Sequence, residues 1–184
     1  MSKALLIIDY SNDFIDDKGA LTCGEVGQVL DEPICGAIKD MILEDGFIFA
    51  CNDRHQINDP YDMEAKLFPA HNIVGTWGEE LYGKTGDLVR ELLKIQPEKT
   101  VYVPKLCYSA FQGTPLDAML RVRAVDTLVV CGVCTDICVL HTVIAAHYLG
   151  YRVQVMLNAC ATMNEIGQKW AFAHMRDCLS VELI

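Results

Sequence analysis

The sequence predicts a three-layer α/β fold, with a mostly parallel sheet of six strands flanked by helices. Two observations indicate this fold: short apolar runs rich in Val and Ile recur along the chain, and helical patterns stand between them. Runs that are apolar on both faces are typical of a parallel sheet that helices cover on both sides. Alternation of strands and helices implies right-handed crossovers between the strands.

The six apolar runs are the predicted strands. They span residues 4–8, 47–51, 100–104, 127–133, 152–157 and 179–184. All are short, and their β-branched residues favour strands over helices. The first run follows a single Lys3 and is closed by Asp9, without a small-residue cleavage site. We therefore expect a buried first strand here and not a signal peptide.

Five helical patterns connect these strands. They cover residues 26–46, 88–95, 114–123, 135–150 and 164–177. Pro33 is expected to break the first pattern near its start. In the third pattern, Thr114 is the expected N-cap, Pro115 the first helical residue and Asp117 the capping-box partner.

One long segment, residues 53–85, lacks a clear period and contains Pro60, Pro69 and several glycines. Loops of this length inside a compact domain are usually functional. The chain shows no internal repeat, low-complexity tract or linker, so residues 1–184 are predicted to form a single domain.

Composition excludes several classes of partner. Hydrophobic residues make up 52% of the chain and charged residues 22%, which is typical of a globular protein. The net charge is −10 and there is no run of Lys and Arg, so neither nucleic acid nor an anionic membrane is an expected partner. The nine cysteines have no framework spacing, which favours free thiols and a cytoplasmic location.

Polar residues follow four of the predicted strands. In chain order these are Asp9, then Asp53 and His55, then Lys105, and finally the turn 134–138 with its two cysteines. Ligands of open α/β sheets bind at the carboxyl ends of the strands. The four strands are therefore expected to deliver these side chains to one shared site.

The cysteines of the fourth turn differ in their expected roles. Cys131 lies inside a strand and is expected to be a buried, inert thiol. Cys138 falls in the first helical turn if Thr135 or Asp136 is the N-cap, where a thiolate is favoured, and a nearby lysine would lower its pKa further. Nucleophile is the best interpretation of Cys138. A zinc site fits the Cys-x2-Cys-x3-Cys spacing poorly, and a disulfide between Cys134 and Cys138 stays open.

Three features of the sequence resemble the isochorismatase-like cysteine hydrolases. They are Asp9 at the end of the first predicted strand and the segments "KLCYSAFQGT" (105–114) and "GVCTDICV" (132–139). Within that superfamily, residues 53–83 are similar to the nicotinamidases, which carry D-x-H followed by a second His ahead of G-T. The resemblance implies an isochorismatase-like, Rossmann-like sheet of about six parallel strands.

The resemblance also implies catalytic roles. Cys138 would be the nucleophile, Asp9 the general base and acid, and Lys105 the group that holds the thiolate. Backbone N–H groups of Cys134 and Cys138 would form the oxyanion hole, with a cis peptide between Val133 and Cys134.

A divalent metal is implied in the same way, with zinc expected first and manganese or iron as alternatives. Its ligands would be Asp53, His55 and His71, with Glu64 as a fourth or water-mediated ligand. The candidate walls for a flat aromatic substrate are Phe14, Leu21, Phe68 and Tyr108.

The function implied is hydrolysis of nicotinamide to nicotinate and ammonia through a cysteine thioester, a step in pyridine nucleotide salvage. The expected partner is a small amide substrate, and assembly into a homo-oligomer stays open. The alternative is a relative acting on another small amide or on isochorismate, although no extra Arg stands near the motifs to receive its two carboxylates. A third hypothesis is a non-catalytic thiol protein in which Cys134 and Cys138 form a redox switch.

Overall fold

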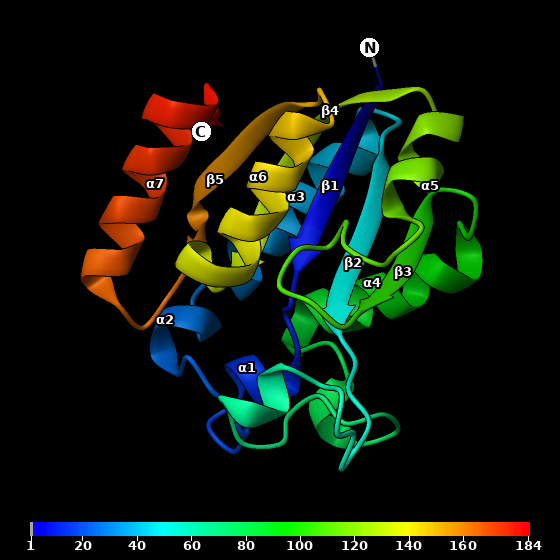
Figure 1. Ribbon diagram of the computed structural model, residues 1–184. Coiled ribbons are helices and arrows are strands. Elements are labelled where there is room, and N and C mark those ends of the chain that lie inside the picture. Colours follow the sequence, from blue (N-terminus) through cyan, green and yellow to red (C-terminus); the bar gives the residue numbers. More distant parts are fainter. Residues whose placement is uncertain (1) are drawn as a thin grey trace.

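The computed structural model describes residues 2–184 and places six strands in one sheet, in the order β3-β2-β1-β4-β5-β6 (Figure 1). Neighbouring strands are parallel throughout, so the predicted six-stranded sheet is confirmed and is all-parallel. The chain builds β2 and β3 on one side of β1 and then β4, β5 and β6 on the other. This reversal opens a crevice at the carboxyl ends of β1 and β4.

The strand bounds agree with the predicted runs in the centre of the sheet and differ at one edge. The strands are β1 (Ser2–Ile8), β2 (Phe47–Asp53), β3 (Thr100–Lys105), β4 (Val125–Val133), β5 (Arg152–Ala161) and β6 (Glu182–Leu183). β5 runs past residue 157, where it was expected to end. β6 is shorter than predicted because it pairs only with Gln154 and Val155 of β5.

Helices cover both faces of the sheet. They are α1 (Asn12–Ile15), α2 (Glu25–Gln28), α3 (Asp31–Leu43), α4 (Gly83–Ile95), α5 (Leu116–Val122), α6 (Leu140–Tyr148) and α7 (Glu165–Leu179). In Figure 1, α3 and α4 pack together behind the sheet, whereas α5 and α6 lie in front and α7 packs against α6. None of the helices within residues 2–184 is long and apolar enough to cross a membrane.

Short elements gather at the carboxyl ends of the strands, at the lower end of Figure 1. The 3-10 turns η1 (Glu64–Lys66) and η2 (Trp77–Glu79) lie in the long segment without a period, and the π-helical turn η3 (Thr135–Val139) leads from β4 into α6. These elements, with α1 and α2, surround the crevice.

Two predictions about helix starts were wrong in part. The pattern 26–46 is interrupted near its start, as predicted, but between α2 and α3 at residues 29–30 and not at Pro33. Pro33 lies in the first turn of α3, where the N–H that proline lacks has no helical partner. At α5, Thr114 Oγ1 accepts a hydrogen bond from the Leu116 N–H at 3.3 Å, as a cap does. The helix, however, begins at Leu116, and the Asp117 carboxylate accepts from the Tyr151 hydroxyl (2.7 Å) instead of closing a capping box.

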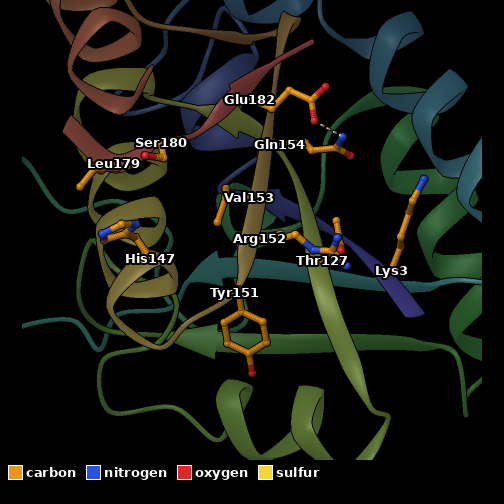
Figure 2. A pocket seen from close by; sticks show the side chains of 10 residues that line it. All are labelled: Lys3, Thr127, His147, Tyr151, Arg152, Val153, Gln154, Leu179, Ser180 and Glu182. Atoms are coloured by element: carbon orange, nitrogen blue, oxygen red, sulfur yellow. Dashed lines mark hydrogen bonds between the residues drawn. The ribbon is translucent and has the colours of Figure 1, made fainter. Parts of the chain in front are cut away.

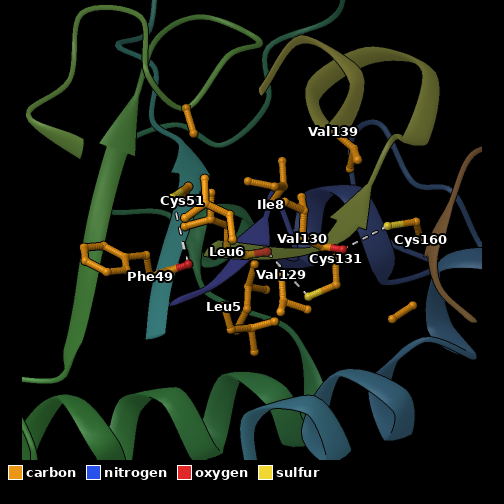
Figure 3. Close-up of a cluster of buried hydrophobic side chains, with 14 of the residues drawn as sticks. Leu5, Leu6, Ile8, Phe49, Cys51, Val129, Val130, Cys131, Val139 and Cys160 are labelled. Carbon is orange, nitrogen blue, oxygen red and sulfur yellow. Dashed lines mark hydrogen bonds between the residues drawn. The ribbon is translucent and has the colours of Figure 1, made fainter. Parts of the chain in front are cut away.

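The core lies around β1 and β4, where Leu5, Leu6 and Val130 are fully buried (Figure 3). Cys131 is also fully buried, as predicted, and its thiol donates to the Leu6 carbonyl at 3.6 Å. Gly132 has a φ of +119°, and a Cβ there would lie 2.0 Å from the Ile8 carbonyl oxygen. This close approach keeps β1 and β4 paired up to the point where the site begins.

Candidate active site

Asp9 stands at the centre of the crevice, directly after β1, with a positive φ of 52°. Its N–H donates to the Cys51 carbonyl (2.9 Å), and its Oδ1 accepts from the Asp53 N–H (2.7 Å). The side chain is fully buried. These bonds fix the carboxylate between the ends of β1 and β2.

Lys105, the last residue of β3, is buried beside two carboxylates. Its Nζ lies 2.7 Å from Asp9 Oδ2, forms an ion pair with Asp53 Oδ1 and donates to the Cys107 carbonyl at 3.2 Å. Burial disfavours the ammonium, but Asp53 and Asp9 outweigh it and raise the pKa of Lys105 well above its usual range. The lysine therefore stays charged and ties β1, β2 and β3 together at the site.

Cys138 lies in η3, on the other side of Asp9. The peptide bond between Val133 and Cys134 is cis, as the resemblance implied. The residue that flanks the start of η3 is Cys134 and not Thr135 or Asp136, and its carbonyl accepts the Val139 N–H at 3.2 Å. Within this turn Cys138 is buried, with 6% of the residue exposed. Its sulfur lies within 4.8 Å of oxygens of Asp9 and Asp53.

The electrostatics of the thiol differ from the sequence expectation. Burial raises the pKa of Cys138 well above its usual range; Lys105 opposes this, but Asp9 and Asp53 add to it. A resting thiolate was expected, and the structure instead favours a thiol that needs a base beside it. Burial and the charge of Asp53 raise the pKa of Asp9 to about 7, although Lys105 and a hydrogen bond with Cys138 lower it. A carboxyl group in this range can both accept and return a proton near neutral pH.

Four predicted metal ligands come together beside this set. One ligand atom from each of Asp53, His55, Glu64 and His71 lies within 4.8 Å of the others, and all four residues are buried. Asp53 Oδ2, His55 Nε2, Glu64 Oε1 and His71 Nε2 have no hydrogen-bond partner. Buried polar atoms without partners are costly, so their convergence fits a divalent cation. Two imidazoles with carboxylates suit zinc, manganese or iron.

Residues that the sequence did not single out orient these ligands. Asp62 Oδ2 lies 2.7 Å from His55 Nδ1, close enough for an ion pair but out of line for a hydrogen bond, and Asp62 Oδ1 accepts the Glu64 N–H at 2.8 Å. His71 Nδ1 lies 2.8 Å from the Pro69 carbonyl, which turns Nε2 toward the cluster. Such outer partners fix the ring orientation of metal-binding histidines. The Asp-x-Glu spacing of Asp62 is common in turns and carries no distinctive signal.

Cys138 and three of the four predicted ligands, Asp53, Glu64 and His71, line one narrow pocket of about 80 Å³. Its lining includes all four predicted walls: Phe14, Leu21, Phe68 and Tyr108. Val133, Ile137 and Met163 complete the apolar surface and were not predicted. The pocket therefore offers a mostly apolar enclosure with polar groups at its base.

A larger hollow, of about 390 Å³, lies at the opposite end of the strands, near the starts of β1, β4 and β5 (Figure 2). Lys3, Thr127 and His147 line it, and Gln154 Nε2 donates to Glu182 Oε2 at 2.6 Å across its edge. None of its lining residues belongs to a convergent set of ligand atoms or is a cysteine. Size alone does not make it the site of chemistry.

The fold and the narrow pocket together define a parallel α/β protein with a buried thiol and a candidate metal site at the carboxyl ends of its strands. The model of the isochorismatase domain matches residues 3–182, and the chain therefore belongs to the isochorismatase family, which confirms the resemblance seen in the sequence.

Similar proteins point to one branch of this family. The chain is 42% identical to PncA, an isochorismatase family protein of Bacillus subtilis, over 100% of this chain and 99% of that protein. It is 29% identical to the nicotinamidase of Escherichia coli, over 94% of this chain and 89% of that enzyme. The crystal structure of a pyrazinamidase/nicotinamidase from Streptococcus mutans matches with a TM-score of 0.96 and 40% identity, covering 100% of both chains.

Proposed function

We propose that this protein hydrolyses nicotinamide to nicotinate and ammonia, with Cys138 as the nucleophile. The observation that carries the proposal is that the Cys138 thiol, the Asp9 carboxyl group and a candidate metal-binding cluster lie together beside one mostly apolar pocket. The nicotinamidases among the similar proteins support the choice of substrate.

Acylation would begin at the thiol. The Cys138 sulfur attacks the carboxamide carbon while its proton passes to Asp9, which has a carboxylate oxygen within 4.8 Å of the sulfur. Asp9 then gives this proton to the nitrogen as the C–N bond breaks, and ammonia leaves. Backbone N–H groups of Cys134 and Cys138 would stabilise the oxyanion.

In deacylation, water would take the place of the thiol as the group from which Asp9 accepts a proton. Water attacks the thioester carbonyl while Asp9 takes its proton, the C–S bond breaks, and nicotinate leaves as the thiol is restored. Lys105 would stabilise the negative charges of Asp9 and Asp53 through both steps, because it forms ion pairs with both carboxylates.

Asp53, His55, Glu64 and His71 would hold the metal. When bound, a divalent metal supplies a Lewis acid that holds the pyridine nitrogen. Phe14, Leu21, Phe68 and Tyr108 would flank the ring and keep the amide carbon in front of Cys138, which is a matter of orientation and not of activating the carbonyl.

A pair of substrates tests this proposal. Ammonia release is measured for nicotinamide and for benzamide, which has the same amide and no ring nitrogen. We expect turnover of nicotinamide, much weaker turnover of benzamide, and loss of both in Cys138→Ala. Equal turnover of the two amides would remove the role given to the ring nitrogen, and no turnover of nicotinamide would overturn the proposal.

The alternative substrate isochorismate is less well supported. Its two carboxylates call for cationic partners, yet no Arg or Lys is among the described residues that line the pocket. Asp53 and Glu64 in that lining would repel an anion.

A further inference from the structure

Two cysteine sulfurs touch in the wall of the active-site pocket. Cys23 Sγ and Cys134 Sγ lie 3.5 Å apart, although 111 positions separate them in the sequence. Cys134 lines the pocket at the start of η3, and Cys23 belongs to the loop between α1 and α2 that also carries the wall residue Leu21. The sulfur neighbour of Cys134 is thus Cys23, and not Cys138 as one sequence hypothesis had it.

The backbone holds the two sulfurs in this arrangement. The Cys23 N–H donates to the Phe14 carbonyl (2.7 Å), and the Leu21 N–H donates to the Asp13 carbonyl (3.0 Å), so the loop is fastened to α1. Cys23 is 7% exposed and Cys134 is half-buried. Cys134 forms part of the pocket wall, so small solutes can reach the Cys134 side of the pair from the pocket.

The pair is chemically unequal. The hydrogen bond with Cys134 lowers the pKa of Cys23, although burial and Asp136 oppose this. The same hydrogen bond and burial raise the pKa of Cys134. Oxidation follows thiolate character, so Cys23 is the sulfur that an oxidant meets as the stronger nucleophile.

We propose that Cys23 and Cys134 form an oxidative modification site, at which a peroxide converts the thiol pair into a disulfide that reversibly inhibits the enzyme. The Cys23 thiolate attacks a peroxide oxygen and the O–O bond breaks, which leaves a sulfenic acid and, after uptake of a proton, water. The Cys134 sulfur then attacks the sulfenic sulfur; the S–S bond forms, the S–O bond breaks, and the departing hydroxide takes the Cys134 proton. Two thiols lose two electrons, and one hydrogen peroxide becomes two waters.

Formation of the disulfide would move two parts of the pocket wall. A disulfide has an S–S distance near 2.0 Å, so the sulfurs have to approach by about 1.5 Å. That movement draws the Leu21 wall and the η3 turn, which carries Cys138, toward each other across a narrow pocket. Displacements of this size in a site that depends on orientation are expected to lower kcat/KM roughly tenfold to a hundredfold.

The experiment treats the reduced, metal-loaded protein with a small excess of hydrogen peroxide and blocks the remaining thiols by alkylation. Peptide mass spectrometry then maps the links, and ammonia release is measured before and after addition of a thiol reductant. We expect a Cys23–Cys134 peptide, loss of two of the nine thiols and a fall in activity that the reductant restores. The inhibition readout rests on the proposed function, whereas the cross-link does not, so failure of one is distinguishable from failure of the other.

Two variants serve as controls. Cys23→Ser should keep the basal activity, form no cross-link and lose the reductant-reversible inhibition. Cys178→Ser, which alters an exposed cysteine far along the chain, should behave like the parent protein. An absent cross-link, with inhibition that follows oxidation of Cys138 equally in the parent and in Cys23→Ser, would overturn the proposal. A cross-linked protein with full activity would overturn its regulatory part.

Discussion

At Cys138 the protein surrounds a buried thiol with one lysine and two carboxylates, which have opposing effects on its pKa. Lys105 favours the thiolate, while burial, Asp9 and Asp53 favour the thiol. In the proposed reaction, Cys138 therefore becomes a nucleophile only as Asp9 takes its proton. Such an arrangement protects the thiol between turnovers because a thiol reacts more slowly than a thiolate with electrophiles.

Replacement of Cys138 by Ala should abolish turnover, by about 10⁴-fold or more, because the nucleophile has no substitute. Ammonia release from nicotinamide measures the loss, and circular dichroism checks the fold. The matched control is Cys131→Ala, which removes a fully buried thiol with no role in the site. It should keep the activity and lower the free energy of unfolding by about 1 kcal/mol. Comparable turnover in Cys138→Ala would show that another group attacks the amide.

Replacement of Asp62 by Asn should weaken metal binding by about 10–100-fold, because the charge that faces His55 is lost while the side chain keeps its size. Titration with zinc against a chromophoric chelator measures the affinity. Asp59→Asn is the matched control, since Asp59 caps a turn of the same segment through the Tyr61 N–H and contacts no ligand. Equal zinc affinity in the two variants would mean that Asp62 serves only the turn.

At the scale of elements, the sequence predicted what depends on periodic apolar residues and on strand ends. The strands β1 to β4 could be predicted because each is an apolar run in the sequence. The proximity of Asp9, Asp53 and Lys105 could be predicted because each of them follows such a run at a strand end. The short edge strand β6 was overestimated, since an edge strand depends on its single neighbour and not on its own pattern. Contacts between irregular loops, such as Cys23 with Cys134, have no periodic signal and could not be predicted.

Gly132 offers a test of how β1 and β4 are joined next to the site. Gly132→Ala should destabilise the protein by about 2–3 kcal/mol or more, because the new Cβ meets the Ile8 backbone and the positive φ is strained for alanine. Chemical denaturation measures this loss. Gly36→Ala, at an open position within α3, is the opposite case and should stabilise by about 0.5–1 kcal/mol. A neutral Gly132→Ala would show that the strands can separate there without cost.

At the scale of the whole molecule, four buried atoms of the cluster lack hydrogen-bond partners, so the proposed cation would stabilise the fold as well as serve the site. The acidic chain and its pocket without Arg or Lys in the described lining suit a neutral ring amide bound beside a cation. Assembly into a homo-oligomer and a cytoplasmic location stay predictions of the sequence.

Removal of the metal with a chelator should lower the thermal stability and abolish hydrolysis of nicotinamide, while Cys138 stays reactive toward a small alkylating agent. A ligand that binds only the folded state, at a free concentration a thousandfold above its Kd, raises the free energy of unfolding by about 4 kcal/mol. Differential scanning calorimetry with and without zinc measures the shift, and re-addition of zinc should restore both properties. A metal-free protein with full activity would contradict the role given to the cluster.

Asp53 turns one oxygen to Lys105 and the other to the metal-binding cluster. In the proposed mechanism, substrate binding and the charge of the catalytic group therefore depend on a single side chain, and we expect a substitution at Asp53 to alter both. New specificities would have to come from residues that line the pocket away from this carboxylate, among them Phe68, Ile137 and Met163. Efforts to redirect this enzyme to other amides should vary the walls and leave the shared carboxylate untouched.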